Sequence, residues 1–465
     1  MKTTTLKRHN FFLVCLNLLL LILSVIIHTL LQDYEIYPVL AYEYFIIIII
    51  TYSVLVAKRK MRWFHSYIIF AGSFTLFLCS RIILDVVGIN SLNETSLYIY
   101  YTIKDSVICQ SLFLLIISFL SVNIGFYLVA DFRSHMFIID DEKKNFNDIS
   151  LKKLVVILLI ICLPGTFLKL WHDFMFVRAN GYLALYSDFE SAPLLFRLSW
   201  MAFNIIFPVI LLFYKEKRTV MLWLIIMLIL SFSDALKGAR SSFISPLVFF
   251  GWFYYKFYSL NDLKIKNVII IFALFLIISE LFILYRSGIS FDNFGKENLL
   301  AIFLYQQGVS FTLLPIYIDY QNDIINPSNF YILYPLVNLF QRFFDPVFRG
   351  GHSLERVQST LSIDDKIMYT INPDAYLNGS GIGSSYILET YALGGILSVI
   401  IFSMILGFII AKMEKILANK KYIWLSWIWI PHLAWMSRGA YFPSLLMFIL
   451  TLSSVKLLKG LLKRR

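Results

Sequence analysis

Residues able to do chemistry gather in one stretch of this chain, residues 286–385, between two long apolar segments. The stretch ends in a glycine-rich run at positions 379–386, just where the next apolar segment begins. A glycine-rich entry to a helix exposes backbone N–H groups to which an anion can bind, and serines there can cap the helix. The run therefore predicts an anion site, with these candidate ligands: Gly381, Gly383, Ser384 and Tyr386. The alternative is that the glycines only form a tight turn.

Four arginines lie near this run or where a polar loop meets an apolar segment: Arg240, Arg286, Arg342 and Arg438. Two of them, Arg240 and Arg438, adjoin a Gly-Ala pair, and Lys237 precedes the first pair. A guanidinium group is a planar fork of donors that holds a phosphate through two hydrogen bonds. Three charge-assisted contacts, at roughly 1.5–3 kcal/mol each, together approach roughly 8 kcal/mol. That is the reduction in activation free energy that corresponds to about a millionfold acceleration. The arginines predict that a leaving pyrophosphate is stabilised without a metal, although arginines at span ends also snorkel to lipid headgroups.

Transfer of a sugar or acyl group also needs a base for the attacking hydroxyl. Four side chains are candidates for this catalytic role: His352, Glu389, Asp345 and Glu355. His352 follows two glycines in polar sequence, which is unlike the setting of a core histidine. Glu389 lies early in an apolar segment, where an ionisable group is costly and is usually functional or paired. We expect Glu389 to bind sugar hydroxyls or to anchor an arginine.

Other common chemistries have no motif in the sequence. It contains no G-x-x-x-x-G-K-[ST] phosphate loop and no H-E-x-x-H metal motif. The four cysteines fall inside apolar segments without C-x-x-C spacing. The pair Asp364 and Asp365 is a candidate cation site, but an exposed carboxylate pair in a loop usually binds nothing. We therefore expect no cofactor, no metal and no nucleic acid as a partner.

The composition describes the elements that must position these residues. Hydrophobic residues make up 59% of the 465-residue chain and mean hydropathy is +0.74, which is typical of a polytopic membrane protein. We interpret residues 1–465 as one all-α membrane domain, with 286–385 as its large loop. Runs of about 17–25 apolar residues predict about twelve spans, near residues 11–31, 37–57, 63–87, 106–130, 153–172, 198–214, 219–235, 241–258, 267–285, 385–411, 422–437 and 441–458.

Charged residues assign the two faces of the membrane. Most of the 41 lysines and arginines fall in alternate connections and near the two termini, so the positive-inside rule places these in the cytoplasm. The large loop then faces outside. Its apolar run 299–320 could cross the bilayer only with a cytoplasmic return that carries no lysine or arginine. We therefore predict that 299–320 and 329–344 are helices lying on, or dipping into, the outer face.

Three short motifs accompany this layout. They are Lys-Gly-Ala-Arg-Ser-Ser at 237–242, Gly-x-Gly-x-Ser followed by Glu-x-Tyr and Gly-Gly within 381–395, and Arg438-Gly-Ala-Tyr. Together with the layout, they resemble the Wzy-type O-antigen polymerases of Gram-negative bacteria. The resemblance implies a GT-C-type glycosyltransferase of the inner membrane that acts at the periplasmic face. It would join undecaprenyl-pyrophosphate-linked oligosaccharide repeat units by an inverting, metal-independent reaction that releases undecaprenyl pyrophosphate.

The same resemblance implies two protein partners, a Wzz-type chain-length regulator and a Wzx-type flippase. One departure from the family is that the outer loops carry no clear double copy of an arginine-rich motif. The division between donor and acceptor sites therefore stays open. Two other functions also stay open. An O-antigen ligase shares the layout and the outer loop, whereas a lipid-linked oligosaccharide flippase or transporter predicts midplane charges and a repeated half.

Overall fold

The structure is a computed structural model. It describes residues 2–59, 61–95, 101–130, 149–181, 184, 192–213, 215–238, 241–258, 264, 266–267, 299–349 and 351–463. Within these ranges the regular secondary structure is helical apart from one two-residue antiparallel pair, β1 (Glu94–Thr95) and β2 (Tyr101–Thr102). The expected all-α class is thus confirmed for the described part of the protein.

The first half of the chain forms long helices together with a few short ones. They are α1 (Lys2–Asp33), α2 (Val39–Lys58), α3 (Ser66–Leu78), α4 (Ser80–Val86), α5 (Asp105–Val129), α6 (Ile149–Asn180), α8 (Leu194–Ile206), the 3-10 helix η2 (Phe207–Phe213), α9 (Lys217–Ala235) and α10 (Ser241–Phe257).

The second half contains shorter helices and two further long ones. They are α12 (Leu299–Gln307), α13 (Val309–Tyr320), α14 (Tyr334–Phe344), α15 (Leu354–Ser359), α16 (Ile363–Ile371), α17 (Pro373–Leu377), α18 (Tyr386–Leu417), α19 (Ser426–Trp435), the 3-10 helix η7 (Met436–Arg438) and α20 (Phe442–Lys463). Three further 3-10 turns lie between them: η4 (Tyr331–Leu333), η5 (Pro346–Arg349) and η6 (Lys420–Leu425).

The described residues contain seven helices long and apolar enough to cross a membrane, or up to nine if two bent pairs each count as one span. The pair α3 and α4 bends by 61°, and the pair α12 and α13 bends by 44° at Gly308. We expected about twelve spans. The expected span 422–437 is divided among η6, α19 and η7. The expected span 267–285 lies outside the described residues except for Asn267. The run 299–320 is a broken pair, compatible with a broken span or a re-entrant loop.

Helix α5 lies at the centre of the bundle because it is apolar on every side, and such a helix is buried. It packs against α18, α1 and α2. The contact with α18 is close because both helices present a glycine. A Cβ added at Gly125 would overlap the carbonyl oxygen of Met404, and one at Gly407 would overlap that of Val122. This packing fixes the part of α18 that follows Gly395. Gly394 and Gly395 have non-helical backbone angles and divide α18 by a kink, and the part before the kink borders the glycine-rich run.

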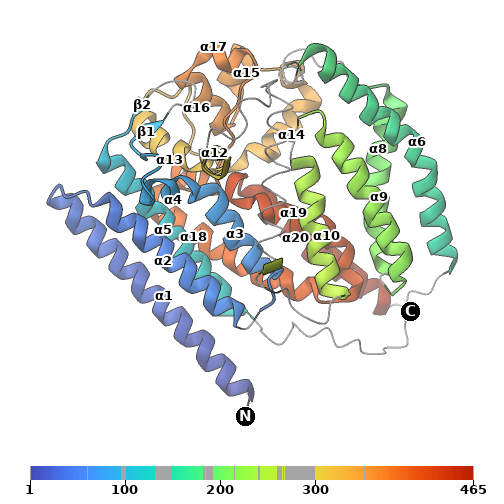
Figure 1. Ribbon diagram of the computed structural model, residues 1–465, viewed down its shortest axis with the longest axis horizontal. Helices are drawn as coiled ribbons and strands as arrows, with labels where there is room; N and C mark the ends of the chain where they lie inside the picture. The colour runs from blue at the N-terminus through green and yellow to red at the C-terminus, as the bar shows by residue number, and fades with distance from the viewer. Residues whose placement is uncertain are drawn as a thin grey trace.

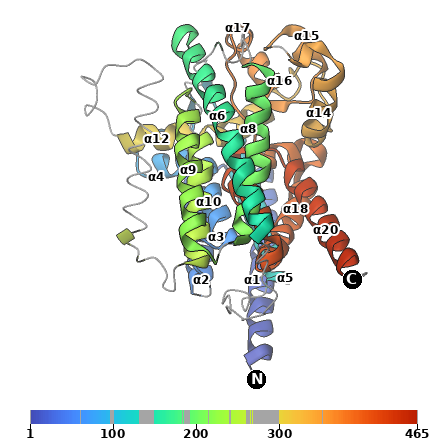
Figure 2. The same ribbon diagram turned by 90° about the vertical axis from the view of Figure 1, so that its right-hand side faces the viewer.

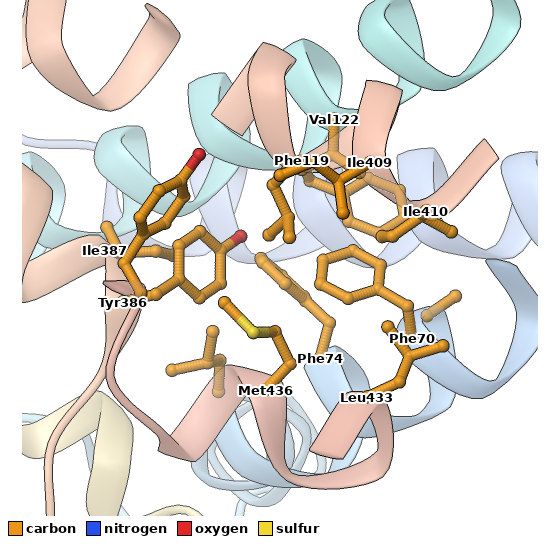
Figure 3. Packing of buried hydrophobic residues seen from close by; sticks show 14 of the residues in the cluster. Phe70, Phe74, Phe119, Val122, Tyr386, Ile387, Ile409, Ile410, Leu433 and Met436 are labelled. Atoms are coloured by element: carbon orange, nitrogen blue, oxygen red, sulfur yellow. The ribbon is translucent and has the colours of Figure 1, made fainter. Parts of the chain in front are cut away.

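The first turn of α18 is also anchored in the apolar core (Figure 3). Tyr386 and Ile387 are fully buried there, and Met436 of η7 reaches the same cluster. The labelled partners come from α3, α5, α18 and α19: Phe70, Phe74, Phe119, Val122, Ile409, Ile410 and Leu433. The core therefore holds the start of α18 and the segment just before α20 in fixed relation to each other.

The two ends of the bundle differ. Figures 1 and 2 show the two chain termini at one end, and α14, α15, α16 and α17 at the opposite end. Helices α4 and α12 pack against each other nearer the second end. Within the expected loop 286–385, the described residues thus form a cap of short helices over one end of the bundle.

Candidate functional site

The glycine-rich run forms the turn from α17 into α18. Gly379 and Gly383 have φ angles of 87° and 76°, a left-handed conformation that L side chains rarely adopt. A Cβ added at Gly383 would lie 3.5 Å from Nε of Arg438, and one at Gly381 would lie 4.0 Å from Cε1 of His352. The turn is therefore flanked by Arg438 on one side and His352 on the other. Three segments that are far apart in the sequence meet here.

Arg438 ends η7, which packs against α3. Its guanidinium carbon lies 5.9 Å from the centre of the Phe77 ring, and the side chain is half-buried. Helix α18 begins beside it, and Ser385 caps that helix by accepting a hydrogen bond of 3.3 Å from the Ile387 N–H. A helix N-terminus next to a guanidinium group is a suitable place for a phosphate.

Glu389 is buried, with 2% of its surface exposed, and both of its carboxylate oxygens accept hydrogen bonds. Oε2 accepts from the Tyr441 N–H at 2.9 Å, and Oε1 accepts from the Ser384 hydroxyl at 3.3 Å. Ser384 belongs to the glycine-rich turn and Tyr441 follows Arg438 in the motif Arg-Gly-Ala-Tyr. We expected Glu389 to bind sugar hydroxyls or to anchor an arginine. Its two hydrogen bonds show that it joins the glycine-rich turn to the segment that carries Arg438.

This geometry predicts different outcomes for two substitutions of Glu389. In Glu389→Gln, the amide oxygen can still accept from Tyr441 and the amide nitrogen can donate to Ser384, so we expect activity within about threefold of the original. Glu389→Ala leaves the buried Tyr441 N–H without an acceptor, a cost of roughly 1–3 kcal/mol, and releases the turn. We expect it to lose most activity.

Polymer yield per amount of membrane-inserted protein measures both variants. A large loss in Glu389→Gln with normal insertion would contradict the positioning role, and would indicate that the negative charge itself takes part in the reaction.

His352 is half-buried and stacks on the Tyr376 ring, with 4.3 Å between ring centroids. Its Nδ1 lies 2.9 Å from the carbonyl oxygen of Tyr376. A carbonyl can only accept, so Nδ1 carries the hydrogen and the neutral ring keeps its lone pair on Nε2. Burial, more than any other cause, lowers the pKa of His352 from its ordinary value. Burial therefore favours the neutral ring, which is the form that can accept a proton at Nε2.

The other two candidate bases have local roles in the structure. Asp345 follows α14, and its Oδ1 accepts a hydrogen bond of 2.9 Å from the Val347 N–H. Glu355 is exposed in the first turn of α15, which is capped by Ser353. Neither is placed beside the glycine-rich turn by a contact that the structure shows. Their catalytic roles stay predictions.

Two candidate binding residues lie in other surroundings. Tyr386 is fully buried in the core, and its hydroxyl is 2.7 Å from that of Ser118. Lys237 pairs with Asp234 at 2.6 Å and lies 3.7 Å from Asp173 of α6. Arg240 and Arg286 lie outside the described residues, and Arg342 is described only as a backbone position in α14.

Sequence reasoning missed the buried surroundings of His352. Asp365 is 7% exposed and pairs with Arg356 at 3.2 Å. From the sequence, we expected Asp365 to be one of an exposed carboxylate pair in a loop, and only the helix periodicity of α15 and α16 could have suggested that Asp365 and Arg356 face each other. Among the described residues, no group of three or more His, Cys, Asp or Glu side chains could hold a metal ion.

Comparison with known proteins gives one finding. The family model described as O-antigen polysaccharide polymerase Wzy matches residues 10–464, nearly the whole chain. No curated protein and no solved structure matches significantly.

Proposed function

The chain belongs to the O-antigen polysaccharide polymerase Wzy family, and we propose that it is an inner-membrane glycosyltransferase that joins undecaprenyl-pyrophosphate-linked repeat units. The family implies polymerisation of glycosyl units and a lipid-linked O-antigen repeat unit as substrate. The proposed glycosyl transfer from undecaprenyl pyrophosphate rests on one observation. His352, the glycine-rich turn and Arg438 meet at one place. These supply a base and an anion site, the two parts that a glycosyl transfer from pyrophosphate requires.

In the proposed reaction, a hydroxyl of the incoming repeat unit attacks the anomeric carbon of the growing chain. The bond from that carbon to the pyrophosphate oxygen breaks, and undecaprenyl pyrophosphate leaves with the electron pair. Nε2 of His352 takes the proton of the attacking hydroxyl. Arg438 and the N–H groups at the start of α18 stabilise the charge that develops on the leaving group. A single displacement of this kind inverts the anomeric centre and needs no metal.

The orientation that we propose puts both termini in the cytoplasm and residues 286–385 in the periplasm, on a GT-C-like membrane domain. The arrangement at the two ends of the bundle supports it (Figure 1). Helix α14 exposes Phe340 and Phe344, at 56% and 82% of their surfaces, as expected of a helix lying at a membrane interface. A chain-length regulator and a flippase are the protein partners that the proposal includes.

Cysteine labelling tests the orientation. In a variant lacking the four native cysteines, Leu377→Cys on α17 should react with a membrane-impermeant maleimide added to intact spheroplasts. Lys415→Cys, at the other end of α18, should react only after the membrane is opened. Both side chains are exposed in the structure. The reverse pattern would place the site in the cytoplasm and contradict the proposal.

Product analysis tests the reaction. Purified protein in liposomes, given only the lipid-linked repeat unit, should produce a ladder of oligomers and release undecaprenyl pyrophosphate. Transfer onto lipid A core without a ladder would show a ligase. Movement of the substrate across the membrane without any new glycosidic bond would show a flippase.

A further inference from the structure

The environment of His352 carries an inference that rests on the proposed function and goes one step beyond it. Three short helices of the cap surround the ring: α15 with Arg356, α16 with Asp364 and Asp365, and α17 with Tyr376. Oδ1 of Asp365 lies 3.9 Å from Nε2 of His352. While the ring is neutral, Nε2 and the carboxylate can both only accept, so no hydrogen bond joins them.

The Asp365 carboxylate is held in a fixed direction. Its Oδ2 accepts a hydrogen bond of 3.2 Å from Arg356, which leaves Oδ1 on the side of His352. The Asp365 N–H donates to the Ser362 hydroxyl oxygen at 3.2 Å, so the first turn of α16 is fixed as well. Asp364, the neighbouring carboxylate, is turned toward Ser362 by a hydrogen bond from that hydroxyl. The two acidic residues therefore have different partners.

We propose that Asp365, held by Arg356, is the positioning residue of His352 and balances the charge that the ring gains when Nε2 takes the proton of the attacking hydroxyl. The attraction is weak while the ring is neutral and becomes strong when the ring is an imidazolium. An interaction that grows along the reaction accelerates it, whereas one present throughout does not. Asp365 itself gains no proton and touches no substrate in this scheme.

The groups that face His352 predict opposite effects for two substitutions. Asp365→Asn removes a negative charge, which disfavours the imidazolium, so the pKa of His352 falls. Arg356→Gln removes a positive charge, so the pKa rises; the Arg356 charge is one of the causes that now lower it. The charge of Asp364 also raises the pKa of His352, and burial and the charge of Asp365 raise the pKa of Asp364 to about 6. Asp364 therefore titrates in the same range as His352, and both variants keep Asp364 unchanged.

The experiment measures polymer formation by the full-length protein in liposomes from about pH 5 to about pH 8, where a histidine base titrates. Activity should rise with pH as His352 loses its proton. In Asp365→Asn that rise should move to lower pH by about one unit, with the plateau reduced about tenfold. In Arg356→Gln the rise should move to higher pH. Asp374→Asn, an exposed carboxylate on α17, is the matched control and should keep the original profile.

A loss of folded protein lowers the activity plateau but does not change the pH at which activity rises. Shifts of that pH in opposite directions therefore separate an effect on His352 from an effect on stability. If Asp365→Asn reduces the plateau while the rise stays where it is, the inference is overturned and Asp365 only supports the cap. If the original protein forms no ladder at any pH, the proposed function fails instead. The inference also fails if His352→Gln keeps the original pH profile, because the rise then belongs to another group.

Discussion

Replacing Arg438 by lysine is expected to reduce polymerisation by roughly 10- to 100-fold, because a charge-assisted contact contributes about 1.5–3 kcal/mol and each 1.36 kcal/mol changes a rate about tenfold. Lysine keeps the charge but replaces a planar fork with a single ammonium group, which cannot bind two oxygens of one phosphate in the same geometry. The variant should still insert into the membrane. A ladder assay normalised to the amount of inserted protein measures the effect.

The position of Arg438 is the reason to expect so large an effect. Its Nε faces Gly383 closely enough that a Cβ there would lie at 3.5 Å, so the guanidinium group borders the turn that opens α18. In the proposed reaction, the N–H groups of that first turn and the guanidinium would act on the same anion.

The matched control is Arg59→Lys, an exposed arginine just after α2 at the opposite end of the bundle. It should keep normal activity. Normal ladders from Arg438→Lys would show that this arginine only holds η7 against α3 through Phe77.

Replacing His352 by glutamine is expected to reduce the rate by about 100-fold, the lower end of the range for a general base. The lower end applies because pyrophosphate is already a good leaving group, so the attacking hydroxyl needs less assistance. Glutamine can keep a hydrogen bond to the Tyr376 carbonyl through its amide group, but it cannot take a proton at neutral pH. The loss should appear in the rate of polymerisation rather than in the amount of protein.

The pH profile gives His352→Gln a second readout. In the original protein, activity requires the neutral ring and so should fall as pH drops through the pKa of His352, which burial lowers from its ordinary value. Activity should therefore persist somewhat below pH 6.5, and the fall should disappear in the variant. His172→Gln, on α6, is the control and should retain both rate and profile. An unchanged fall in His352→Gln would assign the base to another residue.

The sequence by itself determined the properties that depend on local composition. A membrane span is a helix because its backbone groups must be satisfied internally, and it needs about 20 apolar residues because the hydrocarbon core is about 30 Å thick. That requirement is visible in the residues of α1, α2, α5, α6, α9 and α18 before any folding is considered. The glycine-rich turn, Glu389 and Arg438 could likewise be identified as candidate site residues, because residue type and proximity to an apolar segment can be read directly from the sequence. So could the family, through the layout and three motifs.

Only the tertiary structure decided which of these residues meet. The bends of 61° between α3 and α4 and 44° between α12 and α13 arise in runs that are continuous in hydropathy, so a count of apolar runs could not reveal them. Tyr386 is buried in the apolar core. Lys237 pairs with Asp173 and Asp234. The meeting of His352 with Asp365 and of Glu389 with Tyr441 depends on how separate helices pack. A sequence shows no such contact, because packing energy comes from neighbours in space and not from neighbours in the chain.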